Sequence, residues 1–342
     1  MGSSDQARVV RNTLIVLLLV GVAMLLTQLS FVFLLIFAAI LLATLIRSAA
    51  LPFLHMGLPD TPATLLGLAA IVALLWLAGG LFGAQLGEQF VIVGNQLPGA
   101  IARAQQWAAG IPFFRSMLSS TPDIQNVAGR VLTFAFGAVG AATNLVLVVI
   151  AAIYLALQPG LYAGGVAKLF PKNEGPRVAE ALHASGLALR KYLLAQFVTM
   201  VAVGTLVGVG LTFVGVPSAA ALGVIVGLAN FVPLVGPFIG AVPGILLAFA
   251  QSPETGLAAT AVYMVAQQLE GNLLTPLVQR FAVSIPPALL LFALAGLGSL
   301  FGVLGVIVSA PLAVVLYTLV TMLWTRDALG HDVKVPGIDR GA

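Results

Sequence analysis

The chain has 342 residues, of which 60% are hydrophobic and only 8% are charged, with a formal net charge of +4. Soluble globular proteins carry about 25% charged residues, so this composition excludes a soluble domain and indicates an all-α polytopic membrane protein. The absence of cysteine excludes disulfides and thiolate chemistry. The three histidines are scattered along the chain, so neither a metal centre nor any other cofactor is expected.

The first 62 residues are predicted to form a membrane hairpin. No charged residue occurs between positions 12 and 46. The polar run 27–30 would separate two short membrane helices, at 12–28 and 31–46. Because this apolar run is 35 residues long, it is not typical of a cleaved secretory signal.

Residues 63–157 are predicted to contain the third and fourth membrane helices. The third, at 63–83, has close to the ~20 residues that a bilayer requires, and the fourth lies at 131–157. Between them, residues 84–130 mix charged and aromatic side chains at helical spacing. This pattern predicts exposed amphipathic helices at the membrane interface, and a small folded cap is the alternative.

The distribution of basic residues predicts the orientation. With eight crossings and a cytoplasmic N-terminus, 11 of the 15 lysines and arginines lie inside, as the positive-inside rule requires. Residues 158–191 are then a cytoplasmic amphipathic segment, and 326–342 are a polar cytoplasmic tail, expected to be disordered. We therefore expect a multi-pass protein of the inner cell membrane with both termini in the cytoplasm.

Residues 192–325 are predicted to form the functional core. The stretch 222–249 is uncharged but rich in proline and glycine, and each internal proline removes a backbone hydrogen bond. Backbone groups freed in hydrocarbon persist only where protein or a water-filled cavity covers them, so a broken helix here predicts a cavity. The expected breaks and hinges of the whole core are Pro233, Gly236, Pro237, Gly240, Pro276, Gly302, Gly305 and Pro311.

Glu270 is the one carboxylate deep inside an apolar element. A carboxylate in a membrane is costly, which makes it a candidate site for a coupling proton, a cation or a polar solute. Gln267 and Asn272 are expected to share its polar face. Asn230, which lies just before Pro233, is a further candidate. The structural alternatives are that Glu270 is half-solvated near a helix end and that Asn230 serves freed carbonyl groups.

The sequence carries no hydrolase motif and no phosphate-binding loop, so an enzyme is not expected. Transport by such a chain must be coupled to an ion gradient or run downhill. A nucleic-acid partner is also not expected, because the modest positive charge is typical of membrane-facing loops.

Three blocks of the sequence resemble a known family. They are Asn230-Phe-Val-Pro233-Leu-Val-Gly236-Pro237-Phe-Ile-Gly240, then Gln267-x-x-Glu270-Gly-Asn272-x-x-x-Pro276, then Phe301-Gly302-x-x-Gly305 followed by Ala310-Pro311-Leu. Their order and spacing resemble the signature of the autoinducer-2 exporter family, the PerM-like permeases. The likeness is strongest over 160–325.

The resemblance implies about eight membrane crossings with broken or re-entrant helices, a homo-oligomer (a pentamer) in the bilayer, and elevator-like export of a small molecule. Members have been assigned both quorum-signal export and sodium/proton antiport, so the substrate does not carry over. The leading hypothesis is therefore a secondary transporter for a small polar solute. A monovalent cation/proton antiporter with Glu270 as the titrating group is the alternative. A non-transporting scaffold is disfavoured by the helix breaks.

Overall fold

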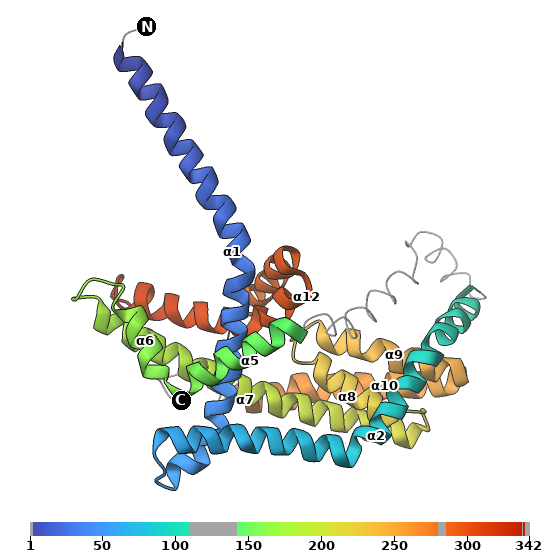
Figure 1. The fold of residues 1–342 in the computed structure, drawn as a ribbon. Coiled ribbons are helices and arrows are strands. Elements are labelled where there is room, and N and C mark those ends of the chain that lie inside the picture. The colour runs from blue at the N-terminus through green and yellow to red at the C-terminus, as the bar shows by residue number, and fades with distance from the viewer. Residues whose placement is uncertain (1–2, 110–141, 280–284, 337, 339–342) are drawn as a thin grey trace.

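The computed structural model describes residues 3–109, 142–279, 285–336 and 338. This part of the chain is helical and contains no strand, which confirms the predicted all-α class. The helices (Figure 1) are α1 (Ser3–His55), α2 (Asp60–Ala109), α5 (Ala142–Leu157), α6 (Pro159–Ala167), α7 (Gly175–Val214), α8 (Ala219–Ala229), α9 (Gly236–Gln251), α10 (Pro253–Leu269), α11 (Thr275–Gln279) and α12 (Pro287–Leu319). Two π-helical segments, η2 (Glu270–Leu274) and η3 (Val320–Arg326), follow α10 and α12.

Four helical stretches of the described residues are long and apolar enough to cross a membrane: Leu29–His55, Asp60–Gly80, Gly175–Val214 and Pro287–Arg326. The pair α5 and α6, bent by 87°, is a fifth if it counts as one span. Helices α8 and α9 have 11 and 16 residues, fewer than the ~20 needed to cross a bilayer. The structure thus has four to five apolar spans, and the count of eight crossings stays a prediction.

The predicted N-terminal hairpin is wrong, because residues 12–46 lie within the single helix α1. The run 27–30 contains Thr, Gln, Leu and Ser but no proline or glycine. Polar side chains of this kind lower helix propensity only slightly and do not break a helix. Of the other N-terminal predictions, residues 110–130 and 131–141 lie outside the described part of the chain.

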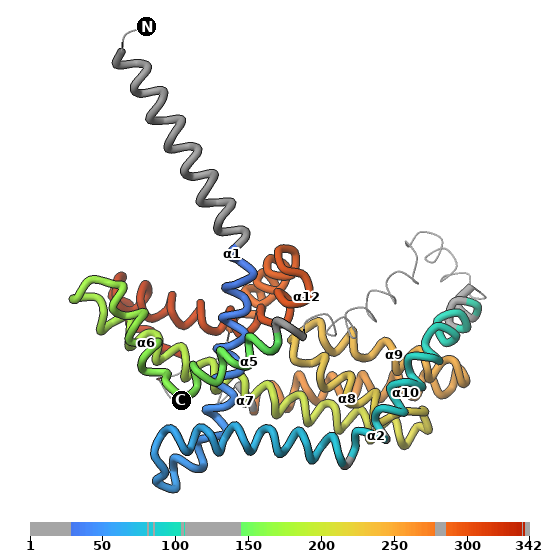
Figure 2. The backbone as a smooth tube through the Cα atoms, viewed as in Figure 1, coloured from blue at the N-terminus to red at the C-terminus, as the bar shows by residue number. Residues whose placement is uncertain are grey.

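The second half of α2 runs beside α9 (Figure 2) and packs against it. Two of its side chains also form hydrogen bonds with the start of α8 and the end of α9. The apolar face predicted for a surface helix here is buried in protein contacts: Val93, Leu97 and Ala100 are each at most 3% exposed. At the start of α8, the backbone N–H of Ala221 donates to Oε1 of Gln89 (3.0 Å). At the end of α9, Arg103 donates to the carbonyl oxygen of Ala250 (2.9 Å). Both bonds occupy backbone groups that helix ends leave free.

Helix α7 joins the two main hydrophobic clusters. Its C-terminal half packs with α8, α9 and α10 through Val203, Val207 and Leu211. Its N-terminal half packs with α1 and α12 through residues 188–193. The helix ends at Gly215, whose φ of 81° is the left-handed conformation that glycine adopts readily at the end of a helix.

Glycines let the backbones of α7 and α8 touch. A Cβ atom on Gly223 would lie 2.6 Å from the carbonyl oxygen of Gly204 and 2.8 Å from Cα of Gly208. Because both neighbours are backbone atoms, no side chain can move aside to make room. The Gly204–Gly208 pair therefore packs within this chain, against the broken half of the core.

We expect Gly223→Ala to destabilise the protein by about 1–3 kcal/mol, because α7 and α8 must move apart to admit the methyl group. Gly208→Ala is the matched control in the same contact, since its Cβ would meet α8 only at 3.5 Å or more, which is ordinary van der Waals distance. Thermal unfolding in detergent measures the difference. Equal melting temperatures for the two variants would contradict the close contact.

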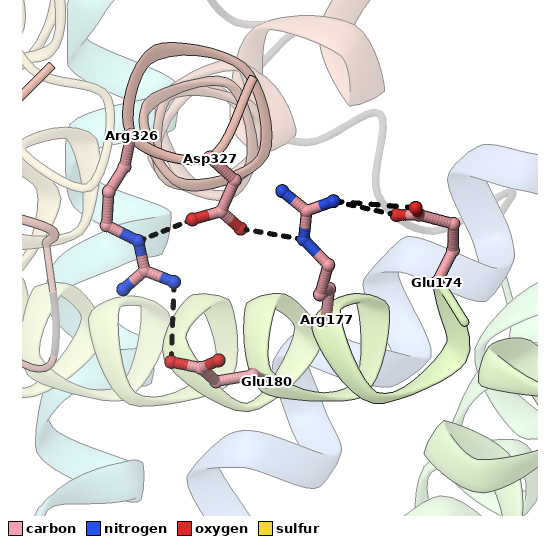
Figure 3. Close-up of polar contacts among 5 residues, drawn as sticks. All are labelled: Glu174, Arg177, Glu180, Arg326 and Asp327. Atoms are coloured by element: carbon pink, nitrogen blue, oxygen red, sulfur yellow. Dashed lines mark hydrogen bonds and ion pairs between the residues drawn. The ribbon is translucent and has the colours of Figure 1, made fainter. Parts of the chain in front are cut away.

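Charged side chains tie the start of α7 to the end of η3 (Figure 3). Arg177 pairs with Glu174 (3.1 Å) and with Asp327 (3.6 Å), and Arg326 pairs with Asp327 (2.7 Å) and with Glu180 (3.4 Å). Beyond the pairs, Val335 is buried in a cluster with α7. The tail is therefore ordered as far as residue 336, contrary to the expected disorder, because one apolar side chain and a charge network anchor it.

Removing the Asp327 carboxylate should loosen this tail. The hydrogen bond from Arg326, with the charges of Arg326 and Arg177, holds the pKa of Asp327 below its usual value. A lowered folded-state pKa stabilises the fold above the unfolded value of about 3.9, and the effect is lost as the pH falls through the folded value.

We therefore expect faster hydrogen exchange over residues 327–336 in Asp327→Asn at pH 7, with a difference that shrinks below about pH 4. Asp332→Asn changes an exposed carboxylate in the same tail and is the control. Exchange that is unchanged in Asp327→Asn at pH 7 would show that the charge network does not order the tail.

Candidate functional site

The predicted break in the stretch 218–249 is present between α8 and α9. Pro233 and Pro237 lack an N–H group, and Leu234 has a φ of 70°, so residues 230–235 form a turn rather than a helix. Its backbone bonds run from Val232 N to Ala229 O and from Gly236 N to Val232 O. Gly236 is necessary here, because a Cβ atom would clash with the backbone carbonyl of Ala229.

This turn places Asn230 in the protein interior, where it is 1% exposed. Its side-chain Nδ2 donates to Oε1 of Glu270 (3.2 Å), which lies where α10 passes into η2. Its backbone carbonyl accepts a hydrogen bond from Nε2 of Gln196 in α7 (2.5 Å). Three elements that are distant in the sequence thus meet at one buried polar site.

Glu270 begins a π-helical turn. The π-helical residues are Glu270–Leu274, and they join α10 to α11 without a break in the helix. Single π-turns inside α-helices are rare and occur frequently at functional sites. Gly271, the next residue, is exposed, and no atom of another element lies within 4 Å of where its Cβ would be.

Two acceptor atoms at the site are unused within the described part of the chain. Asn230 Oδ1 and Glu270 Oε2 are both buried, and neither receives a hydrogen bond there. A buried acceptor without a donor is costly, and a carboxylate oxygen more so. The pair therefore fits a ligand that brings hydrogen-bond donors or positive charge.

The structure brings together two of the four predicted binding residues. Asn272 is exposed and donates to Oε1 of Gln268 (3.0 Å) instead of sharing a face with Glu270. The reason is helical geometry, since residues two apart do not face each other. Gln267 lies one turn before Glu270 and lines a neighbouring cavity.

That cavity has a volume of about 320 Å³ and lies between α7, α8, α9 and α10. Its lining is mostly apolar, with polar groups from Tyr263, Gln267 and Gln268 on α10. The hydroxyl of Tyr263 is buried and has no partner within the described residues. Sequence reasoning missed Tyr263, because a tyrosine in an apolar helix has no distinguishing signal.

The remaining predicted hinge residues behave in three ways. Gly302 breaks α12 with a φ of 59°, and the backbone of Gly305 is pressed against the carbonyl of Leu297. Residues eight apart in a straight helix are about 12 Å apart, so the chain folds back there. Gly240 contacts α8 closely (Cβ position 2.8 Å from Val226 Cα). By contrast, Pro276 and Pro311 lie within α11 and α12 and do not end them.

No group of three or more metal-ligating side chains occurs among the residues that the structure describes. The candidate site consists of the polar pair Asn230 and Glu270.

The sequence as a whole was compared with known proteins. A family model described as "AI-2E family transporter" matches residues 14–324. "Putative transport protein YueF" of Bacillus subtilis is 29% identical, over 87% of this chain and 88% of that protein. "Putative permease PerM" of Escherichia coli K12 is 24% identical, over 80% and 82%. "Putative transport protein YrrI" of B. subtilis is 32% identical, over 43% and 42%.

Proposed function

Since the chain belongs to the AI-2E transporter family, we propose that it is a secondary transporter that moves a small polar solute past the buried pair Asn230 and Glu270. Family membership gives the coarse function, a membrane transporter. The observation that carries the proposal is that Asn230 Oδ1 and Glu270 Oε2 are buried acceptors without donors in the described part of the chain, at a helix break.

The chemistry of the pair suggests how transport is coupled. An ionised Glu270 with one unpaired oxygen is unfavourable in a poorly solvated site. A proton, a cation or a solute hydroxyl group would each relieve this cost. Because they compete for the same oxygen, binding of one changes the affinity for the others, which is the thermodynamic basis of coupling.

An elevator-like movement is proposed from the family resemblance. Helices α7 to α10 and the second half of α2 share one hydrophobic cluster, α1 and α5 share another, and α7 also packs against α1 and α12. We propose that α8 to α10 carry the site across the bilayer relative to a scaffold that includes α1 and α5, with α7 linking the two and the folded-back α12 as a re-entrant element. The proposal includes cytoplasmic termini, an inner-membrane location and a homo-oligomer.

The direction and solute are proposed from the family resemblance: export of a small polar molecule such as a quorum-sensing autoinducer. A second candidate is monovalent cation (sodium)/proton antiport, with Glu270 binding either ion. The unpaired carboxylate oxygen favours it, because a cation or proton is the simplest ligand that satisfies that atom. A scaffold without transport is disfavoured by the cost of a helix break at membrane depth.

Flux measurements in proteoliposomes test the proposal. The purified protein is reconstituted, a pH or sodium gradient is imposed, and movement of the candidate solute is followed beside protein-free vesicles. Gradient-driven solute accumulation supports the exporter. Proton movement on sodium addition, without any solute, supports the antiporter. Fluxes no greater than in protein-free vesicles, under both gradients and with all candidate solutes, would contradict transport.

A further inference from the structure

Helix α6 has an unusual place in the fold. All of its residues are apolar or small, yet none of them is buried. It follows α5 after one residue and turns away from it by 87°. With α5 running across the bilayer, a helix at a right angle to it lies parallel to the membrane plane.

Charged groups near the bend between α5 and α6 indicate that the bend lies at the edge of the bilayer. Arg47 of α1 donates to the carbonyl oxygen of Ala156 in the last turn of α5 (3.2 Å) and pairs with Asp60 at the start of α2 (3.3 Å). An ion pair of this kind is stable where water or headgroups reach it and costly in hydrocarbon. The bend between α5 and α6 therefore lies at the interface.

The loop after α6 combines exposed apolar and basic side chains. Leu169 is 83% exposed and Phe170 is 48% exposed. Lys168 and Lys172 flank them and are also exposed. Neither lysine has an acidic partner among the described residues. Glu174, the acidic residue nearest to them in the sequence, pairs with Arg177.

We propose that α6 and residues 168–172 form a foot that binds anionic phospholipids, with Leu169 and Phe170 among the acyl chains and Lys168 and Lys172 on the headgroups. Exposure of the two apolar side chains to water is unfavourable, and so is burial of the two unpaired lysines against an apolar protein surface. A negatively charged lipid surface satisfies both. This binding is independent of the transported solute.

Tryptophan quenching by brominated lipids tests the foot. Phe170→Trp is made in a variant whose three native tryptophans are replaced by Phe, and it is reconstituted with brominated phosphatidylglycerol or brominated phosphatidylcholine. The introduced tryptophan should be quenched by both lipids and more strongly by phosphatidylglycerol. The preference for phosphatidylglycerol over phosphatidylcholine should fall about fivefold when either Lys168 or Lys172 is changed to Gln. This fold-change corresponds to about 1 kcal/mol per lysine.

Two controls separate this site from general lipid contact. The first control is a protein whose only tryptophan is Trp76, which is 76% exposed and lies in an uncharged stretch of the sequence. Its quenching should not differ between the two lipids. Lys334→Gln removes an exposed lysine from the tail and should leave the lipid preference of the Phe170→Trp reporter unchanged.

The proposal is overturned if neither lipid quenches the tryptophan introduced by Phe170→Trp. That result is expected if water or a second copy of the protein, rather than lipid, covers the foot. Equal quenching by the two lipids, unaffected by Lys168→Gln and Lys172→Gln, also overturns it. Should the tryptophan-free background not assemble, a nitroxide on Leu169→Cys in this cysteine-free chain gives the second reading. It should be more accessible to oxygen than to a water-soluble nickel complex, and the reverse result contradicts insertion.

Discussion

Glu270→Gln is expected to insert and assemble normally but to lose most gradient-coupled transport, by more than about tenfold in rate. The glutamine keeps the shape of the side chain, and its carbonyl oxygen still accepts the bond from Asn230 Nδ2. Its amide group takes the place of the unpaired Oε2, so the variant loses the charge and the free acceptor while the size of the side chain is kept. Stability should therefore be kept while ion or solute binding is lost.

Flux in proteoliposomes, measured across a pH series, tests this prediction. Asn272→Ala is the matched control, because Asn272 is only two residues away but is exposed and bonded to Gln268; its flux should remain close to wild type. Wild-type rates with an unchanged pH profile in Glu270→Gln would make the residue structural. If Glu270→Gln does not assemble, Gln267→Ala, which changes the lining of the neighbouring cavity, becomes the variant to measure.

Gly236→Ala is expected to lower both stability and transport. A Cβ atom at this position would overlap the backbone carbonyl of Ala229 and lie 3.1 Å from Cα of Asn230. Only the backbone can move to admit it, so the turn between α8 and α9 must open, at a cost of about 1–3 kcal/mol or more. Opening the turn also displaces Asn230 from Glu270, so the site is damaged together with the fold.

The melting temperature of the purified variant and its flux per folded protein measure the two effects separately. Gly271→Ala is the control, since a Cβ there meets no atom within 4 Å, and it lies next to Glu270 in the same site. A Gly236→Ala protein that melts with wild type and transports normally would show that the turn tolerates a side chain.

The sequence predicted the features that depend on local chemistry. The all-α class, the apolar spans and the break at residues 230–235 all follow from apolar runs and from proline and glycine. The predicted family membership is also confirmed. Glu270 was chosen as a candidate because a carboxylate in an apolar element is costly, and Asn230 because it lies just before Pro233, where the helix was expected to break. Their pairing was not predicted, since the two residues are 40 positions apart and meet only because α8 and α10 both pack against α7 and α9.

The errors share a physical cause. The hairpin at 12–46 was inferred from polar residues that a continuous helix accommodates. The disorder of the tail was inferred from its polar composition, which does not reveal that one valine is buried and that five residues form ion pairs. The amphipathic segment 84–130 was predicted to lie at the membrane interface, with a small folded cap as the alternative, and the apolar face of its residues 93–101 packs on α9. Hydrophobic periodicity identifies which face of a helix is buried but does not identify what buries it.

The two hydrogen bonds from α2 to the α8–α9 pair have a consequence for synthesis of the protein. Gln89 and Arg103 precede their backbone partners by 132 and 147 residues. A chain made from its N-terminus therefore completes α2 long before α8 and α9 leave the ribosome. The short helices α8 and α9 cannot span a bilayer alone, so they need a surface already in place to receive them. The second half of α2 is then a template on which the transport site assembles, and a fragment that begins after α2 should insert its long helices but fail to form the pair Asn230–Glu270.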